Sequence, residues 1–261
     1  MSEFDCIVFE KQDAIARITL DRPDAAHGID SRLASELVEA ARQCDRDPRI
    51  KVVVLTAQGR FFCAGGDLRE MISHGDAIGD AAQALADDFH AAISILTRMQ
   101  AVLVIAVNGV AAGGGFSLAL VGDIVLAAES ASFTMAYTRA GLCPDGASSY
   151  FLPRLVGLRR AQELMLTNRT LSAREACDIG RITRVVADDA LQQETDALAE
   201  QLAAGARLSQ AFVRKLLLAS EGHDLEAQMA LEGQLLSRCT ASPDGREGIQ
   251  AFFDKRAAKF E

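Results

Sequence analysis

The sequence predicts an α/β fold, in which strands of a buried sheet alternate with helices. Short runs of β-branched and apolar residues recur along the chain, as at residues 52–55 and 102–107. Between them lie segments whose apolar residues recur at helical spacing, and this alternation is typical of α/β folds. The chain has 261 residues, of which 49% are hydrophobic, so it is long and apolar enough to fill a sizeable core.

The elements of the first half follow from hydrophobic periodicity and capping residues. β-branched runs joined by a short polar segment predict a hairpin, and an Asp or Ser ahead of helically spaced apolar residues predicts a helix start. In chain order these signals predict strands at 6–9 and 16–20, a helix from Asp30 or Ser31 to about Cys44, a strand at 52–55, a helix at 82–99, a strand at 102–107, an apolar helix through Leu120 and a strand at 124–127.

After about Leu171 only helical periodicity remains. The segments near 189–208, 210–220, 225–238 and 244–259 are amphipathic and predict four helices. No low-complexity linker separates the two parts of the chain. We therefore divide it into a core over 1–200 and a C-terminal helical region over 201–261, and such regions often cover a core or a partner subunit.

Composition excludes several classes of function. With 27 basic and 36 acidic residues the formal net charge is -9, which repels nucleic acid and leaves no basic membrane patch. No apolar run reaches the roughly 20 residues of a membrane span, and residues 1–5 lack the layout of a signal peptide, so we expect a cytoplasmic protein. Six scattered cysteines and four histidines without ligand spacing predict reduced thiols and no metal.

Two glycine-rich segments, residues 61–68 and 108–115, each follow a predicted strand. Glycine lets a ligand approach the backbone closely, and amides at a helix start hold negative charge. Two such amides on one oxygen form an oxyanion hole, in which each donor stabilises a transition state by roughly 3 kcal/mol. The alternative is that these glycines only satisfy turn geometry. Phosphate-loop and dinucleotide patterns are absent, so nucleotide hydrolysis and hydride transfer lose support.

Five short motifs occur in a fixed order along the chain. They are Asp21-Arg22-Pro23, Cys63-Ala64-Gly65-Gly66-Asp67-Leu68, Asn108-Gly109-Val110-Ala111-Ala112-Gly113-Gly114-Gly115, Gly122-Asp123-Ile124 and Pro144-Asp145-Gly146. Together they resemble the crotonase family, the enoyl-CoA hydratase/isomerase superfamily, and the resemblance covers essentially the whole chain. It implies a spiral of ββα units with a C-terminal helical trimerisation region, assembled as a homotrimer or hexamer.

The resemblance also implies a ligand and the residues that hold it. The ligand is an acyl-CoA thioester of fatty acid metabolism, with coenzyme A as part of the substrate and no separate cofactor. The amides of Gly66 and Gly114 would bind the thioester oxygen. The residues implied for coenzyme A are Ala64, Asp67, Leu68, Arg69 and, from the terminal helix of the same or a neighbouring subunit, Lys255. Family members carry a basic residue just after Arg-Pro, and here we expect His27 to replace that polar contact.

The family varies the acid and base beside the oxyanion hole. Hydratases carry two glutamates, and those positions hold Ser117 and Tyr137 here. Neither hydroxyl is a base near neutral pH, so two-glutamate hydration is not expected. Asp145 matches the aspartate with which family isomerases move a double bond from the β,γ to the α,β position. Without the family, Asp145 reads as an ordinary turn or N-cap residue.

A second reading of the site comes from residues 163–171 with Asp145 and His90, which are similar to bacterial chlorobenzoyl-CoA dehalogenases. There the matching aspartate attacks the aromatic ring and the matching histidine activates water. This chain has no tryptophan, and His90 alone reads as a surface helix residue. A catalytically silent CoA-binding homologue is a third reading. We expect the acyl pocket to form from segments around Met71, Phe89, Phe116 and Tyr137.

Overall fold

The computed structural model describes residues 4–260. Residues 1–3, which belong to the N-terminal stretch without signal-peptide layout, and residue 261 lie outside the described residues. The described chain forms a six-stranded sheet, ordered β1-β2-β3-β5-β7-β10, and a four-stranded sheet, ordered β4-β6-β8-β9. The strands are β1 (Ile7–Gln12), β2 (Ile15–Leu20), β3 (Val52–Ala57), β4 (Phe61–Cys63), β5 (Val102–Val107), β6 (Val110–Ala112), β7 (Ile124–Ala128), β8 (Ser132–Thr134), β9 (Leu171–Ser172) and β10 (Arg184–Val186).

Successive units of the chain place one strand in each sheet. β3, β5 and β7 enter the larger sheet, and each is followed at once by a short strand, β4, β6 or β8, in the smaller one. Helical segments then return the chain for the next unit. Apart from the antiparallel pairs β1–β2 and β8–β9, the strand pairs are parallel. This arrangement is the predicted spiral of ββα units, and it gathers the carboxyl ends of the parallel strands at one edge.

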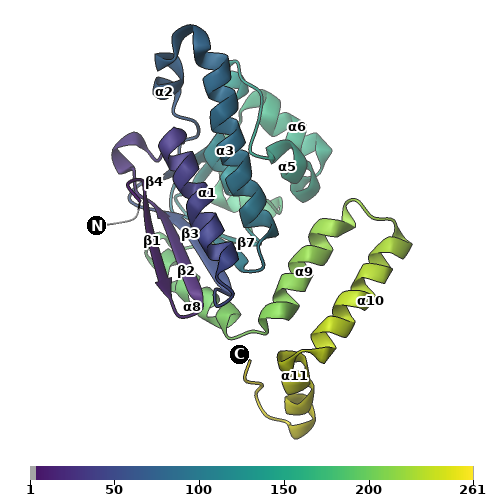
Figure 1. The fold of residues 1–261 in the computed structure, drawn as a ribbon. Helices are drawn as coiled ribbons and strands as arrows, with labels where there is room; N and C mark the ends of the chain where they lie inside the picture. Colours follow the sequence, from purple (N-terminus) through teal and green to yellow (C-terminus); the bar gives the residue numbers. More distant parts are fainter. Residues whose placement is uncertain (1–3, 261) are drawn as a thin grey trace.

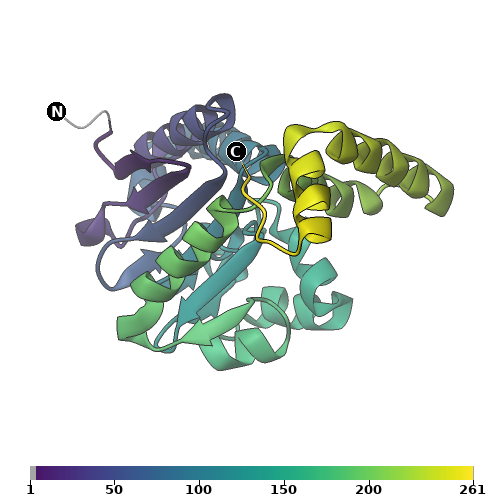
Figure 2. The same ribbon diagram turned by 90° about the horizontal axis from the view of Figure 1, so that it is seen from below.

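The helices cover both faces of the larger sheet. They are α1 (Ser31–Arg46), α2 (Leu68–Ser73), α3 (Ile78–Arg98), α4 (Gly114–Leu118), α5 (Ser148–Val156), α6 (Leu158–Thr167), α7 (Ala173–Asp178), α8 (Leu191–Ala203), α9 (Arg207–Ser220), α10 (Leu225–Ala241) and α11 (Pro243–Asp254). Figure 2 shows α1 and α3 on one side of the sheet and α8 on the other. Because both faces are covered, β3 and β5 are buried along nearly their whole length.

Most predicted elements are confirmed to within a few residues, and three differences stand out. The expectation that only helices follow Leu171 is wrong, because β10 pairs in parallel with β7. The break between the helices predicted at 189–208 and 210–220 comes a few residues earlier than expected, since α8 ends at Ala203 and α9 begins at Arg207. The short strands of the smaller sheet, of two or three residues each, were not predicted.

The last three helices, α9 to α11, project from the sheet-bearing part of the molecule (Figure 1). α8 crosses the predicted boundary at residue 200 and packs against β3, β5 and β7, so it belongs with the core in space. α10 buries only Leu235 within the single chain. Among residues 4–260, no helix combines the length and the apolar character that crossing a membrane requires.

Candidate active site

The two glycine-rich segments pack backbone against backbone. A Cβ atom on Gly115 would lie 2.1 Å from the carbonyl oxygen of Cys63, so only glycine fits this approach. Gly65 has a φ of +103°, in the region that favours glycine. Gly66 and Gly114 lie close together, because a Cβ atom on Gly114 would lie in van der Waals contact with the amide nitrogen of Gly66, at 3.7 Å. Strands β4 and β6, which precede the two turns, pair in parallel and hold them together.

The amides of Gly66 and Gly114 are free to bind a ligand. Ile29 pairs with the neighbours of Gly66, since its N–H donates to Gly65 and its carbonyl accepts from Asp67, at 2.7 and 2.9 Å. Gly114 is the first residue of α4, where a helix leaves its N–H groups unpaired. Within residues 4–260 neither N–H has a hydrogen-bond acceptor. Two adjacent unpaired donors are what an oxyanion hole requires.

Both glycines line a largely apolar cavity of about 270 Å³. Its walls come from both glycine-rich segments, from α2 and α3, and from the loop before α5. The lining residues are Ile29, Ala64, Gly65, Gly66, Leu68, Met71, Ala82, Leu85, Ala86, Phe89, Gly113, Gly114, Ala136, Tyr137, Ala140, Leu142, Cys143 and Asp145. Met71, Phe89 and Tyr137 lie where the sequence placed the acyl pocket. In the segment around Phe116, Gly113 and Gly114 line the cavity, whereas Phe116 itself is fully buried against Phe133.

The α3 part of this wall was missed at the sequence level, except for Phe89. Ala82, Leu85, Ala86 and Phe89 have the i, i+3, i+4, i+7 spacing of one helix face, so the pattern was present. Ile29 was also missed. An isoleucine has no group that suggests binding or catalysis, and Ile29 reaches the site only through its isolated β-bridge to Gly66.

Asp145 is the one carboxylate among the lining residues of this cavity. The Tyr137 hydroxyl donates to its Oδ1 atom at 2.5 Å. The Ser117 hydroxyl lies 3.0 Å from that of Tyr137 and 2.9 Å from the Asp145 carbonyl oxygen, to which it donates. Burial, together with the charge of Asp145, raises the pKa of Tyr137, so the phenol stays protonated and remains a donor. The two positions that lack glutamates therefore supply hydroxyls that hold Asp145 in place.

The backbone turns sharply at Asp145 and directs its side chain to the cavity. Gly146 and Ala147 have φ angles of +59° and +58°, and strained backbone of this kind is typical of functional sites. A Cβ atom on Gly146 would lie 2.5 Å from Phe89, so the position requires glycine. The N-cap of α5 is Ala147, without a capping side chain. The reading of Asp145 as an N-cap residue is therefore wrong.

His90 approaches Asp145 from α3. Its Nε2 atom lies 3.9 Å from Oδ2 of Asp145 and accepts a hydrogen bond of 3.1 Å from the Gly146 N–H. His90 does not line the cavity of Gly66 and Gly114 but a second one beyond Asp145. The structure thus brings Asp145, Tyr137, Ser117 and His90 into one cluster.

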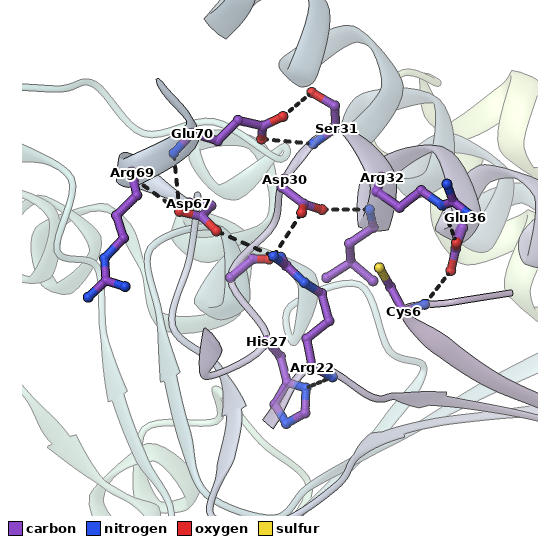
Figure 3. Close-up of polar contacts among 12 residues, drawn as sticks. Cys6, Arg22, His27, Asp30, Ser31, Arg32, Glu36, Asp67, Arg69 and Glu70 are labelled. Atoms are coloured by element: carbon purple, nitrogen blue, oxygen red, sulfur yellow. Dashed lines mark hydrogen bonds and ion pairs between the residues drawn. The ribbon is translucent and has the colours of Figure 1, made fainter. Parts of the chain in front are cut away.

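The residues implied for coenzyme A divide into two groups. Ala64 and Leu68 line the cavity. Asp67 does not, because its carboxylate caps α2 at the Arg69 and Glu70 amides and lies 3.5 Å from Arg22. Arg69 is exposed, and Figure 3 shows its guanidinium directed away from the cluster around Asp67. Lys255 follows α11, which Figure 1 places at the opposite end of the molecule from α2, so one chain does not bring it to the site.

His27 does not replace the polar contact expected at the coenzyme A entrance. Its side chain is fully buried, and Nδ1 accepts from the Arg22 N–H at 3.0 Å (Figure 3). Its Nε2 atom lies 2.8 Å from the Gln58 carbonyl oxygen. Burial lowers the pKa of His27, so the ring is neutral and its two hydrogen bonds stabilise the turn. Within residues 4–260, no group of three or more His, Cys, Asp or Glu side chains is arranged to hold a metal ion.

Comparison with proteins of known structure supports the fold. An enoyl-CoA hydratase from Bacillus anthracis is 28% identical with a TM-score of 0.93, covering 98% of this chain and 99% of its own. An enoyl-CoA hydratase from Polaromonas sp. JS666 is 31% identical with a TM-score of 0.92, over the same shares of the two chains.

Sequence comparison gives the family. The 1,2-epoxyphenylacetyl-CoA isomerase of Escherichia coli is 34% identical over 261 residues, covering 100% of this chain and 99% of the relative. A 4-chlorobenzoyl coenzyme A dehalogenase of Arthrobacter sp is 33% identical over 250 residues, covering 95% of this chain and 91% of the relative. The family model described as enoyl-CoA hydratase/isomerase matches residues 10–261. The chain therefore belongs to the enoyl-CoA hydratase/isomerase family, whose members act on acyl-CoA thioesters.

Proposed function

We propose that this protein moves a double bond in an acyl-CoA from the β,γ to the α,β position, with Asp145 as the acid and base. The observation that carries the proposal is that Asp145 is the one carboxylate lining the cavity that also holds the free Gly66 and Gly114 amides. The name of the Escherichia coli relative, an isomerase, agrees with it.

The reaction transfers one proton between two carbon atoms of the substrate. Asp145 removes a proton from the α carbon, and the thioester oxygen takes up the negative charge between the two amides. The same proton returns at the γ carbon as the double bond shifts. Tyr137 occupies Oδ1 of Asp145, so Oδ2 is the oxygen that carries the proton. The side chain of Asp145 is 36% exposed, which leaves Oδ2 accessible to a bound acyl group.

The test replaces Asp145 with asparagine and follows two readouts. We expect Asp145→Asn to slow conversion of a β,γ-enoyl-CoA, and exchange of its α protons with deuterated water, by roughly 100- to 10,000-fold. The matched control is Asp88→Asn, an exposed carboxylate on α3 that does not line the cavity. Equal rates in wild type and Asp145→Asn would refute the assignment of Asp145 as the proton carrier.

A second candidate is hydrolytic dehalogenation of an aryl-CoA, favoured by the approach of His90 to Asp145 and by the name of the Arthrobacter relative. Here an Asp145 oxygen attacks the ring carbon, chloride leaves with its bonding electrons, and water cleaves the aryl ester. His90 is less suited to activate that water, because the Gly146 N–H already occupies Nε2. Chloride release from a halobenzoyl-CoA, with an ester trapped on Asp145, would establish this reaction. Coenzyme A binding without either reaction would identify a silent homologue.

A further inference from the structure

A second cavity borders Asp145, beyond the one that holds Gly66 and Gly114. Its volume is about 880 Å³. Cys143 and Asp145 form part of the wall of both cavities. The loop that carries Cys143 and Asp145 therefore borders both cavities.

Three helices surround the second cavity, and they can be followed in Figure 1. α3 contributes residues at i, i+3, i+4, i+7 and i+8, which lie on one helix face. α5 and the loop before it form a second wall, and α9 forms the third. The lining residues are His90, Ile93, Ser94, Thr97 and Arg98 from α3, Cys143, Pro144, Asp145, Ala147, Ser149, Tyr150 and Phe151 from the loop and α5, and Lys215, Leu218 and Ala219 from α9.

The cavity has two chemically different ends. Asp145 and His90 lie at one end of the α3 face, and Arg98 lies at the other. Arg98 follows His90 by eight positions, which correspond to about 12 Å along the helix. Apolar side chains such as Ile93 and Leu218 lie among the remaining lining residues. The space is thus suited to a chain that is apolar along its length and charged at its end.

The charge at the far end is positive. Arg98 and Lys215 also line a third cavity of about 370 Å³, together with Arg214 and Arg238, and no carboxylate lines that cavity. Within residues 4–260 neither Arg98 nor Lys215 forms an ion pair. Both side chains are exposed.

In the described part of the chain, Arg98 does not interact with the carbonyl groups at the end of its own helix, α3. A cation in a last helical turn usually interacts with the terminal carbonyl groups. Here Arg214 takes that role, donating to the carbonyl oxygens of Leu96 and Ala101 at 2.9 and 2.7 Å. Arg98 and Lys215 therefore stay available for an anion that enters the cavity.

We propose that the second cavity holds the far end of the acyl group, and that this end is a carboxylate bound by Arg98 and Lys215. The preferred substrates are then CoA thioesters of dicarboxylic acids. Ion pairs between a carboxylate and these two cations would select the acid over a neutral chain of equal length. The inference rests on the proposed function, because it takes the reacting carbons to lie beside Asp145.

The test measures binding, so it does not depend on turnover. Calorimetry compares saturated ω-carboxyacyl-CoA thioesters of increasing chain length with their methyl esters and with free coenzyme A. At the best length we expect wild type to bind the acid roughly tenfold more tightly than the ester, as expected for two partly exposed charge pairs. The double variant Arg98→Gln/Lys215→Gln should bind both within twofold of each other. The control Arg42→Gln, an exposed cation on α1 outside these cavities, should keep the preference.

Two outcomes would overturn the proposal. One is the absence of a preference at every chain length, or a preference that the double variant keeps. The other is an equal loss of affinity for acid, ester and free coenzyme A, which would assign the two cations to the coenzyme A phosphates. Failure of the proposed function would look different, since Asp145→Asn would then retain proton exchange while the binding preference stayed the same.

Discussion

Among the single residues of the site, Gly66 and Gly114 matter because they have no side chain to fill the space around their amides. Their backbones approach closely enough for two N–H groups to face one ligand oxygen, and a side chain on Gly114 would lie beside the Gly66 amide. A Cβ atom on Gly114 would lie 2.9 Å from Ile29 Cδ1 and 3.7 Å from the Gly66 nitrogen. Polarity alone therefore does not make the site, because the site also depends on an empty volume between the two amides.

Gly114→Ala should impair catalysis much more than stability. The added methyl group enters the space beside the Gly66 amide, so the loss of oxyanion stabilisation should lower kcat by roughly 100- to 1,000-fold. Steady-state kinetics on a β,γ-enoyl-CoA, with thermal unfolding in parallel, measures both effects. The control is Gly79→Ala in the first turn of α3, where a Cβ atom would meet nothing within 4 Å. Equal kcat values for the two variants would argue against an oxyanion hole at Gly114.

His27 should make the fold sensitive to mild acid. Burial lowers the pKa of His27, so between pH 6.5 and the lower folded value the unfolded chain binds a proton that the folded chain does not. Stability therefore falls as the pH drops below about 6.5, by at most about 1.4 kcal/mol per pH unit for this one group. Urea unfolding at pH 7.5 and 5.5 should show a smaller difference in His27→Gln than in wild type. His223→Gln, at an exposed position, should behave like wild type.

At the scale of elements, two buried arginines make opposite contributions. Arg214 donates to carbonyl groups at the end of α3 and lies 2.6 Å from the Asp123 carboxylate, which in turn accepts from the Leu103 N–H in β5. Arg181 lies between the rings of Phe116 and Phe133 without a carboxylate partner. Two of its nitrogens have no hydrogen-bond partner within residues 4–260, and burial lowers the pKa of Arg181 to about 9.

Replacing these two arginines with methionine should therefore have opposite effects on unfolding. Arg181→Met removes a desolvated charge and keeps a flexible side chain against two aromatic rings, so we expect a gain of about 1–2 kcal/mol. Arg214→Met leaves the partly exposed Asp123 carboxylate and the carbonyl groups at the end of α3 without their donor, and should cost about 1.5–3 kcal/mol. Denaturant unfolding of both variants measures the difference. A loss in Arg181→Met as large as that in Arg214→Met would mean that its ring contacts outweigh its desolvation.

The elements that the sequence predicted well are those whose pattern is local. β5 is buried on both faces, so it reads as an uninterrupted apolar run, and α1 begins at a capping Asp30. β10 has only three residues and begins with an exposed Arg184, so its pattern is too short to detect. In the site, the glycine turns and Asp145 are visible as motifs, whereas the burial of Phe116 against Phe133 depends on contacts between distant segments. The second cavity, beyond Asp145, forms where α3, α5 and α9 meet, and no local sequence pattern specifies that meeting.

At the scale of the whole molecule, α9 to α11 leave apolar surface uncovered. Leu217, Leu236, Phe252 and Phe253 are 68, 69, 79 and 74% exposed. Soluble monomers rarely expose large apolar patches of this kind, and the removal of such surface from water drives association. Lys255 follows α11 and adjoins this surface. Because α11 lies far from the site of its own chain, Lys255 would reach a coenzyme A site only in a neighbouring chain.

We expect the protein to assemble in solution as three or six copies through α9 to α11. The double variant Phe252→Asp/Phe253→Asp places two charges on the exposed apolar surface of α11, so it should shift the molecular mass towards that of one chain. Sedimentation velocity measures this shift.

If Lys255 serves a neighbouring subunit, the same variant should also weaken coenzyme A binding, whereas Lys255→Gln should weaken binding without changing the mass. Leu158→Asp, an exposed position at the start of α6, is the control, because an acidic residue is favourable at a helix N-terminus. A wild-type mass of one chain, or an assembly that the double variant leaves intact, would place the contact elsewhere and remove the route for Lys255.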